Sequence, residues 1–258
     1  MNLQNIKFET AGEIGTITLD QPQKRNALSL RLLQELIYIL DQLKDNFELK
    51  VIILKGGGGI FSSGHDLTEM INRDLSDYAE IFQACSNFML KIQDMPQTFI
   101  AQVNGVATAA GCQLVAACDL ALAEENALFG TPGVKIGLFC STPAIPLLRA
   151  VGRKLALEML LTGRMITATE AVQHGLINRV VPSGRLETET IAVAQKIAEA
   201  SLLTLSIGKK AFYQQANMTD KDAYTYGSGV MLENIAVRDA QEGIDAFLTK
   251  RKPTWENR

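Results

Sequence analysis

Residues 103 to 123 read V-N-G-V-A-T-A-A-G-C-Q-L-V-A-A-C-D-L-A-L-A. The stretch from Phe99 to Ala123 that contains this run is long and poor in charge, and a helix that spans a bilayer needs about 20 such residues. Asn104, Gln113 and Asp119 interrupt it, however, and V-N-G at 103–105 is typical of a strand end followed by a turn. We therefore expect a buried strand, turn, helix and strand here, and no association with a membrane.

Strands and helices alternate along the chain on both sides of this stretch. The run V-I-I-L at 51–54 is short and fully apolar, as in strands buried on both faces. Ser29 is a good helix N-cap, and apolar residues recur after it at steps of three and four. The same patterns predict strands at 6–10, 14–19, 98–103, 119–123 and 180–182, and helices at 76–94, 109–117 and 143–162.

The alternation predicts an α/β fold with two parts. Residues 1–190 would form an α/β core, and residues 191–258, which read as almost entirely helical, would cover the core or pack against a second subunit. T-A-T-E at 167–170 has the spacing of a capping box and predicts another helix start within the core. A chain of 258 residues is long enough to bury a substantial apolar centre.

Composition restricts the classes of function. The formal net charge of -3 argues against nucleic-acid binding, because such binding needs a strongly basic face. Four cysteines, at 85, 112, 118 and 140, show neither metal-ligand spacing nor a disulfide pattern, so we expect no metal site and reduced, buried thiols. Strand-like sequence begins by Ile6 and leaves no room for a signal or transit peptide. Together these features predict a cytoplasmic protein.

Several common catalytic motifs are missing. The glycine-rich segment 56–64 is followed by His65-Asp66, whereas a P-loop requires Lys and then Ser or Thr. No G-x-G-x-x-G opens a helix, and no G-x-S-x-G is present. The sequence therefore disfavours a P-loop, a dinucleotide-binding fold and a serine-hydrolase triad.

Two segments that each follow a buried strand carry a different signal. One is F-S-S-G-H-D-L at 61–67, and the other is the turn after Asn104 that leads into a helix. Small residues at such places let backbone N–H groups face a ligand, and a helix N-terminus adds partial positive charge. Either segment alone would be read as an ordinary turn, but two of them can aim two N–H groups at one oxygen atom and so form an oxyanion hole.

These segments resemble the crotonase superfamily, the enoyl-CoA hydratase/isomerase family. The resemblance extends in order and spacing through F-G-T-P-G-V-K-I-G-L, A-V-G-R-K-L-A-L-E-M-L-L-T-G and T-A-T-E-A-V-Q-H-G-L-I-N-R-V-V-P, and covers residues 21–253. It implies a spiral of ββα units with a C-terminal helical trimerisation region, assembled as a homotrimer or hexamer. It also implies an acyl-CoA thioester as ligand, with coenzyme A entering as part of the substrate and no separate cofactor.

The resemblance assigns roles to residues of the site. The backbone N–H groups of His65 and Ala110 would hold the thioester carbonyl oxygen, and Asp66 and Leu67 would border the adenine. A pair of fixed amide donors stabilises a developing enolate oxygen by several kcal/mol in a dry site. We expect the imidazole of His65 to lie at the pocket edge without a catalytic part, although a role as proton donor stays open.

The resemblance also points to residues that would contact the nucleotide. Lys24 or Arg25 resembles the basic residue that lies near the CoA phosphates in the family. Either side chain is interpreted equally well as a solvated cation on a loop. Phe247 and Lys250, three residues apart on one expected helix face, look like the pair that reaches the nucleotide of a neighbouring subunit.

The departures from the family pattern concern the chemistry itself. Hydratases of the family use two glutamates, at the positions that Gln113 and Gly133 occupy here. An amide is no base near neutral pH, and glycine has no side chain, so general acid–base contributions of about 100- to 10,000-fold each would be lost. We expect Gly133 to sit in a loop with a positive φ angle. Cys140 is the candidate replacement, since 137–143 contains no carboxylate.

Three functions follow. The first is an acyl-CoA-binding protein of the enoyl-CoA hydratase/isomerase kind whose hydratase activity is doubtful. The second is a carboxyacyl-CoA decarboxylase, because loss of CO2 yields the enolate without a base; the resemblance of F-S-x-G-H-D to methylmalonyl-CoA decarboxylase favours it, while a cysteine at 140 in place of that enzyme's tyrosine weakens it. The third is a non-catalytic acyl-CoA binder.

Overall fold

A six-stranded sheet forms the centre of the computed structural model, which describes residues 1–257. The strands follow the order β1-β2-β3-β4-β6-β9, and all neighbours are parallel except the opening hairpin β1–β2. The bounds are β1 Ile6–Ala11, β2 Ile14–Leu19, β3 Val51–Gly56, β4 Thr98–Val103, β6 Leu120–Glu124 and β9 Arg179–Val181. The predicted strands are confirmed to within about two residues.

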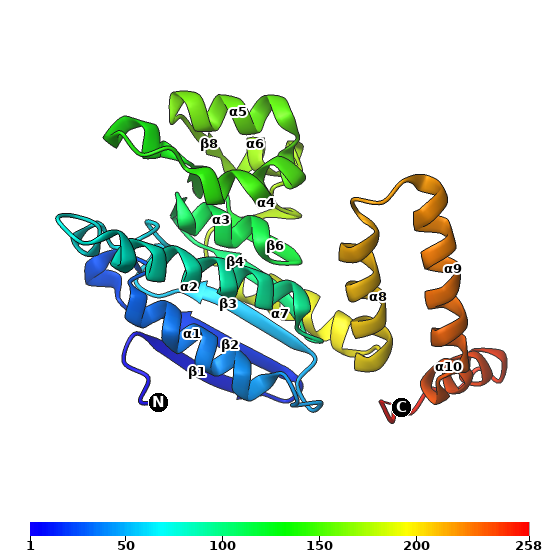
Figure 1. Ribbon diagram of the computed structural model, residues 1–258. Helices are drawn as coiled ribbons and strands as arrows, with labels where there is room; N and C mark the ends of the chain where they lie inside the picture. The colour runs from blue at the N-terminus through cyan, green and yellow to red at the C-terminus, as the bar shows by residue number, and fades with distance from the viewer. Residues whose placement is uncertain (258) are drawn as a thin grey trace.

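Helices cover both faces of this sheet, which explains its apolar strands. Successive side chains of a strand point to opposite faces. Ile52 and Leu54 of β3 belong to the larger apolar cluster with helices α1 (Leu30–Leu43), α2 (Leu75–Asp94) and α3 (Ala110–Ala117). Val51 and Ile53 pack in a second cluster under α7 (Leu186–Ala198) on the other face (Figure 1).

The stretch 103–123 folds as predicted, with one element that the sequence did not indicate. β4 is followed by β5 (Val106–Thr108), then α3 and β6. β5 belongs to a second sheet, of order β5-β7-β8, with β7 at Leu128–Gly130 and β8 at Met165–Thr167. Three-residue strands are too short to show a period of two, so their pairing cannot be seen in the sequence.

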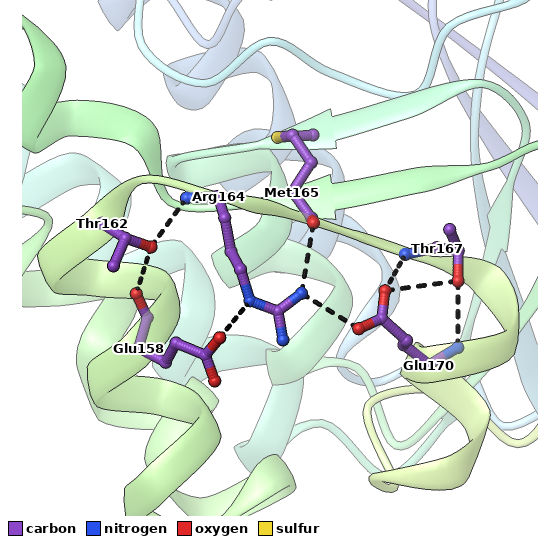
Figure 2. Close-up of polar contacts among 6 residues, drawn as sticks. All are labelled: Glu158, Thr162, Arg164, Met165, Thr167 and Glu170. Atoms are coloured by element: carbon purple, nitrogen blue, oxygen red, sulfur yellow. Dashed lines mark hydrogen bonds and ion pairs between the residues drawn. The ribbon is translucent and has the colours of Figure 1, made fainter.

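Three further helices connect the small sheet to the core: α4 Ser141–Val151, α5 Arg153–Thr162 and α6 Ala168–Gln173. The predicted capping box at the start of α6 is confirmed, because Thr167 Oγ1 accepts from Glu170 N at 3.2 Å and Glu170 Oε2 accepts from Thr167 N at 3.1 Å. Arg164 joins this cap to α5 by donating to Glu158 at 2.6 Å and to Glu170 at 3.0 Å (Figure 2). The network holds β8 between two helix ends.

The C-terminal part consists of α8 (Leu202–Gln215), α9 (Asp220–Ala236) and α10 (Arg238–Leu248), which extend to one side of the core (Figure 1). The predicted α/β class with C-terminal helices is confirmed. The division expected at residue 190 falls inside α7, whose buried face packs on the sheet. α9 has no buried residue, whereas α8 is fixed to the core through Lys209.

No single helix within residues 1–257 is long and apolar enough to cross a membrane. α7 and α8 meet the length and composition criteria only as a pair, and the chain bends by 101° between them.

Candidate functional site

Two turns that are distant in sequence lie together at the carboxyl ends of β3 and β4. Ser62 N donates to Val106 O at 3.1 Å, and Thr108 N donates back to Ser62 O at 2.9 Å. Thr108 Oγ1 also donates to Ser63 O at 3.1 Å. These bonds fix the segment before His65 beside the segment before Ala110.

Glycine at position 64 permits this close approach. Its φ is +92°, and a Cβ placed there would lie 2.8 Å from Ala109 Cβ and 3.1 Å from Ala110 N. Ala109 adopts φ 50° and ψ -119°, a strained region for any residue with a side chain, and its N–H donates to Gly130 O at 2.8 Å. α3 begins at the next residue. The turn therefore presents the first N–H of α3 beside the segment around His65.

The N–H groups of His65 and Ala110 donate to no acceptor within residues 1–257, although Ala110 itself is fully buried. Buried N–H groups are nearly always paired, so two unpaired donors side by side indicate a ligand atom. Both residues line a pocket with a volume of about 940 Å³. The pocket also contains other residues that the sequence singled out, namely Lys24, Arg25, Asp66, Leu67, Gly133 and Cys140.

The imidazole of His65 is buried in the wall of this pocket. Its ring packs edge-on against Phe82, with 5.6 Å between ring centroids, and burial lowers the pKa of His65 to about 4. Nε2 is shielded from solvent and has no hydrogen-bond partner in the described chain. The ring is therefore neutral at pH 7 and offers a ligand no access to Nε2.

Charged residues gather at one part of the pocket. Lys24 Nζ lies 3.2 Å from Asp66 Oδ2, and Asp66 Oδ1 accepts from Thr68 Oγ1 at 2.6 Å. Burial alone would raise the pKa of Asp66, but the hydrogen bonds from Thr68 and Lys24 outweigh it and the pKa is lowered. Arg25 stands next to this pair with a left-handed φ of 55°. The backbone here thus turns sharply between two cationic side chains.

The positions of the expected glutamates hold no acid or base. Gln113 is buried, and its Oε1 has no hydrogen-bond partner within the described residues. Gly133 lines the pocket, whereas Gln113 does not. Gly133 lies in the 3-10 helix η3 (Pro132–Ile136) and does not have the positive φ that we expected. A Cβ there would instead lie 2.2 Å from Leu138 O and 2.7 Å from Cys140 Sγ.

The thiol of Cys140 does not supply the missing base. Burial raises its pKa, although the backbone N–H of Gly133 donates to it. The thiol is therefore protonated at neutral pH and fills the space that a side chain at 133 would need. All four cysteines are buried and unpaired, as predicted. Within residues 1–257, no three His, Cys, Asp or Glu side chains are grouped as metal ligands.

Comparison with known proteins shows which family this chain belongs to. The family model "Enoyl-CoA hydratase/isomerase" matches residues 9–258. The chain belongs to the enoyl-CoA hydratase/isomerase family. It is 51% identical over 250 residues to the zebrafish "Enoyl-CoA hydratase domain-containing protein 3, mitochondrial", covering 96% of this chain and 86% of that protein.

Solved structures of the family share the whole fold. The crystal structure of human enoyl coenzyme A hydratase domain-containing protein 3 superposes with a TM-score of 0.95 at 49% identity, covering 98% of this chain and all of that chain. Among enzymes named for a reaction, the 2,3-dehydroadipyl-CoA hydratase of Escherichia coli is 34% identical over 94% of both chains. The fold class is thus that of the enoyl-CoA hydratase/isomerase family.

The prediction of a cytoplasmic protein is wrong by this comparison, because the family members from zebrafish, mouse and human are all named mitochondrial. Reduced cysteines are compatible with any reducing compartment, so they could not distinguish between the two locations.

One pair of residues with a role implied by the family lies elsewhere. Phe247 is near the end of α10 and is 84% exposed, and neither it nor Lys250 lines the pocket. Lys250 follows the helix and has φ 56°, so the two do not share one helix face as expected. The helix ends at Leu248 because the chain turns back there, with Arg251 N donating to Ala246 O at 3.0 Å.

The sequence did not indicate the apolar part of the pocket, to which Met70, α2, the end of η3 and the loop before α4 contribute. Met70, Phe82, Ile136 and Phe139 line it. Large apolar residues near the two glycine-containing turns were the feature of the sequence that could have indicated this part of the pocket.

Proposed function

We propose that this member of the enoyl-CoA hydratase/isomerase family binds acyl-CoA thioesters with the carbonyl oxygen between the N–H groups of His65 and Ala110, and that it does not hydrate them. The observation that carries the proposal is the pair of unpartnered N–H donors in the wall of one pocket. Fixed donors polarise the thioester carbonyl and stabilise an enolate oxygen.

The rest of the site supports binding more than proton transfer. Hydration needs a group that takes a proton from water and a group that supplies one to the α carbon. Gln113 and Gly133 can do neither. At pH 7 the buried thiol of Cys140 stays protonated and His65 stays neutral. The proposed outcome is a bound, polarised thioester that no side chain of the pocket attacks.

The nucleotide of the thioester would lie beside Lys24, Arg25, Asp66 and Leu67. The cationic side chains suit its phosphates, and the adenine can pair with the backbone of Asp66 and Leu67. We further propose that the chain assembles at least as a trimer through α8–α10. In that assembly Phe247 and Lys250 would approach the nucleotide of a neighbouring subunit.

Calorimetry with butyryl-CoA, butyrate and coenzyme A tests the binding claim. The thioester should bind at least about tenfold more tightly than coenzyme A, and butyrate should bind weakly, because the amide pair and the nucleotide each contribute. Equal affinity for butyrate and butyryl-CoA would contradict the proposal.

A matched pair of variants locates the thioester. Gly64→Ala should weaken butyryl-CoA binding, since its Cβ would press on Ala109 and on Ala110 N. Gly59→Ala is the control, because Gly59 also has positive φ, +81°, but no atom within 4 Å of its Cβ position. If both variants bind butyryl-CoA equally well, the oxygen is not held at this turn.

A further inference from the structure

The last residues of the described chain fold back and join α10 to the end of α7. After α10 the chain turns at Lys250, and residues 251–257, here called the C-terminal tail, return toward the junction of α7 and α8 (Figure 1). Trp255 Nε1 donates to Glu199 O at 2.7 Å, and Glu199 directly follows α7. Because α7 packs on the sheet, this bond attaches the tail to the core.

A buried carboxylate is the centre of this joint. Asp239 lies in the first turn of α10 and is 1% exposed. Its Oδ1 accepts from Glu256 N at 2.8 Å, and its Oδ2 accepts from Asn257 N at 3.0 Å and from Ser201 Oγ at 2.5 Å. Ser201 is the N-cap of α8. Hydrogen bonds to a carboxylate are stronger than those between neutral groups, so Asp239 connects α10, the tail and α8 firmly.

The tail is also held along α10 itself. Arg251 donates to both carboxylate oxygens of Glu242, at 2.6 and 2.7 Å, and Thr254 N donates to Glu242 at 2.8 Å. The ring of Trp255 lies on Gly243, where a Cβ would be 3.1 Å from Cη2 of the ring. The tail therefore contacts α10 on one side and the junction of α7 and α8 on the other.

The position of α10 depends on this joint. α10 follows α9, which has no buried residue, and among its own described residues α10 buries only Asp239 and Ala246. The exposed end of α10 carries Phe247, and Lys250 follows directly after the helix. These are the two residues that would approach the nucleotide of a neighbouring subunit. Their place on the subunit surface is thus set through the tail.

We infer that the C-terminal tail fixes α10 in the orientation that presents Phe247 and Lys250 to the neighbouring subunit's nucleotide, with Asp239 and Trp255 as positioning residues. Side chains that are ordered before binding lose less conformational entropy when the ligand arrives. The inference rests on the proposed function, because it takes Phe247 and Lys250 to contact the nucleotide across a subunit interface.

A double-mutant cycle measured by calorimetry tests the positioning role. Phe247→Ala should weaken butyryl-CoA binding at least about fivefold in the wild-type background. Asp239→Asn keeps the size of the side chain but replaces one accepting oxygen, so it should also weaken butyryl-CoA binding at least about fivefold. In that background Phe247→Ala should cost less than about twofold, because the helix end is already misplaced.

A ligand without a nucleotide and a matched variant serve as controls. Butyryl-pantetheine lacks the nucleotide, so its affinity should be the same for the wild type and for Asp239→Asn. Asp220→Asn removes an exposed carboxylate in the first turn of α9 and should bind butyryl-CoA as the wild type does. Trp255→Leu removes the bond to Glu199 O and should give the same cycle, and it takes the place of Asp239→Asn if that variant does not fold.

Trp255 is the single tryptophan of the chain, so its fluorescence reports whether the tail is in place. In Asp239→Asn its emission should move to longer wavelength, while light scattering should still give the mass of the wild-type assembly. Unchanged emission, dissociation of the assembly, equal weakening of butyryl-pantetheine, or a full cost of Phe247→Ala in Asp239→Asn would overturn the inference while leaving acyl-CoA binding intact. No loss from Phe247→Ala in the wild type would overturn both the proposed contact across the interface and the inference.

Discussion

His65 has a backbone N–H without a partner in the described chain and a side chain whose pKa is strongly shifted. Its N–H is unpaired beside Ala110, whereas its ring is held neutral by burial. Because the pKa is lowered to about 4 from 6.5, the unfolded chain binds more protons than the folded chain between these pH values. The contribution of a neutral His65 to stability is thus complete above pH 6.5 and is lost as pH falls toward 4.

Unfolding measured from pH 7 to pH 4 should show this effect. The wild type should lose roughly 3 kcal/mol more of its free energy of unfolding than His65→Gln over this range. His174→Gln, which removes the exposed second histidine, is the control. Parallel curves for the wild type and His65→Gln would mean that His65 titrates normally.

Close packing around residue 133, and not a positive φ angle, requires glycine at this position. Alanine there would bring Cβ within 2.2 Å of Leu138 O, a backbone atom that moves only with its loop. We predict that Gly133→Ala lowers the free energy of unfolding by about 1–3 kcal/mol, whereas Gly227→Ala, at a helical site with open space, changes it by less than about 1 kcal/mol in either direction. Denaturant titration of both variants decides the point, and equal stability of the two would contradict it.

The same clash limits any attempt to install hydratase groups. Glutamate at 133 needs the loop of residues 138–140 to move, so Gln113→Glu with Gly133→Glu adds carboxylates without the family geometry. We expect this double variant to hydrate crotonyl-CoA no faster than about twice the wild-type rate in a product-formation assay. A larger gain would show that the loop adapts.

At the scale of elements, the attachment of α8 to the core depends on one buried ion pair. Lys209 Nζ lies 2.7 Å from Asp119 Oδ2, with side chains only 9% and 13% exposed, and also donates to Ile92 O and Gln97 O. Tyr213 OH donates to the other oxygen of Asp119 at 2.7 Å. Loss of Lys209 leaves the buried carboxylate of Asp119 without an opposite charge.

Lys209→Met should therefore lower the free energy of unfolding by about 3 kcal/mol at a fixed protein concentration. Lys210→Met, at the exposed neighbouring position, should change it by less than about 0.5 kcal/mol. Urea titrations compare the two, and similar midpoints would show that the pair contributes little.

Elements long enough to show a periodic pattern could be predicted from sequence, whereas the three strands of the small sheet could not. The apolar run of β3, the N-cap Ser29 and the capping box at Thr167 each carry a local signal, and the structure has them in place. β5, β7 and β8 have three residues each and depend on pairing between distant segments. The candidate site was predictable where backbone N–H groups follow glycine-containing turns, but the burial of His65 and the clash at Gly133 depend on tertiary packing.

At the scale of the whole molecule, the C-terminal helices have apolar surface to bury. Met231 and Leu232 of α9 are 65% and 71% exposed, and no residue of α9 is buried. Surfaces of this kind are typical of subunit interfaces. Light scattering at micromolar concentration should give at least three times the monomer mass of 28.2 kDa. A monomer would contradict assembly through α8–α10.

We propose that the protein holds a thioester without transferring protons to or from it. Proton NMR of crotonyl-CoA with an equimolar amount of protein in heavy water tests both parts in one sample. We expect broadened or shifted acyl resonances, which report binding, with no 3-hydroxybutyryl-CoA beyond that in a sample without protein. Unchanged acyl resonances, or formation of the hydrated product faster than in the protein-free sample, would contradict it.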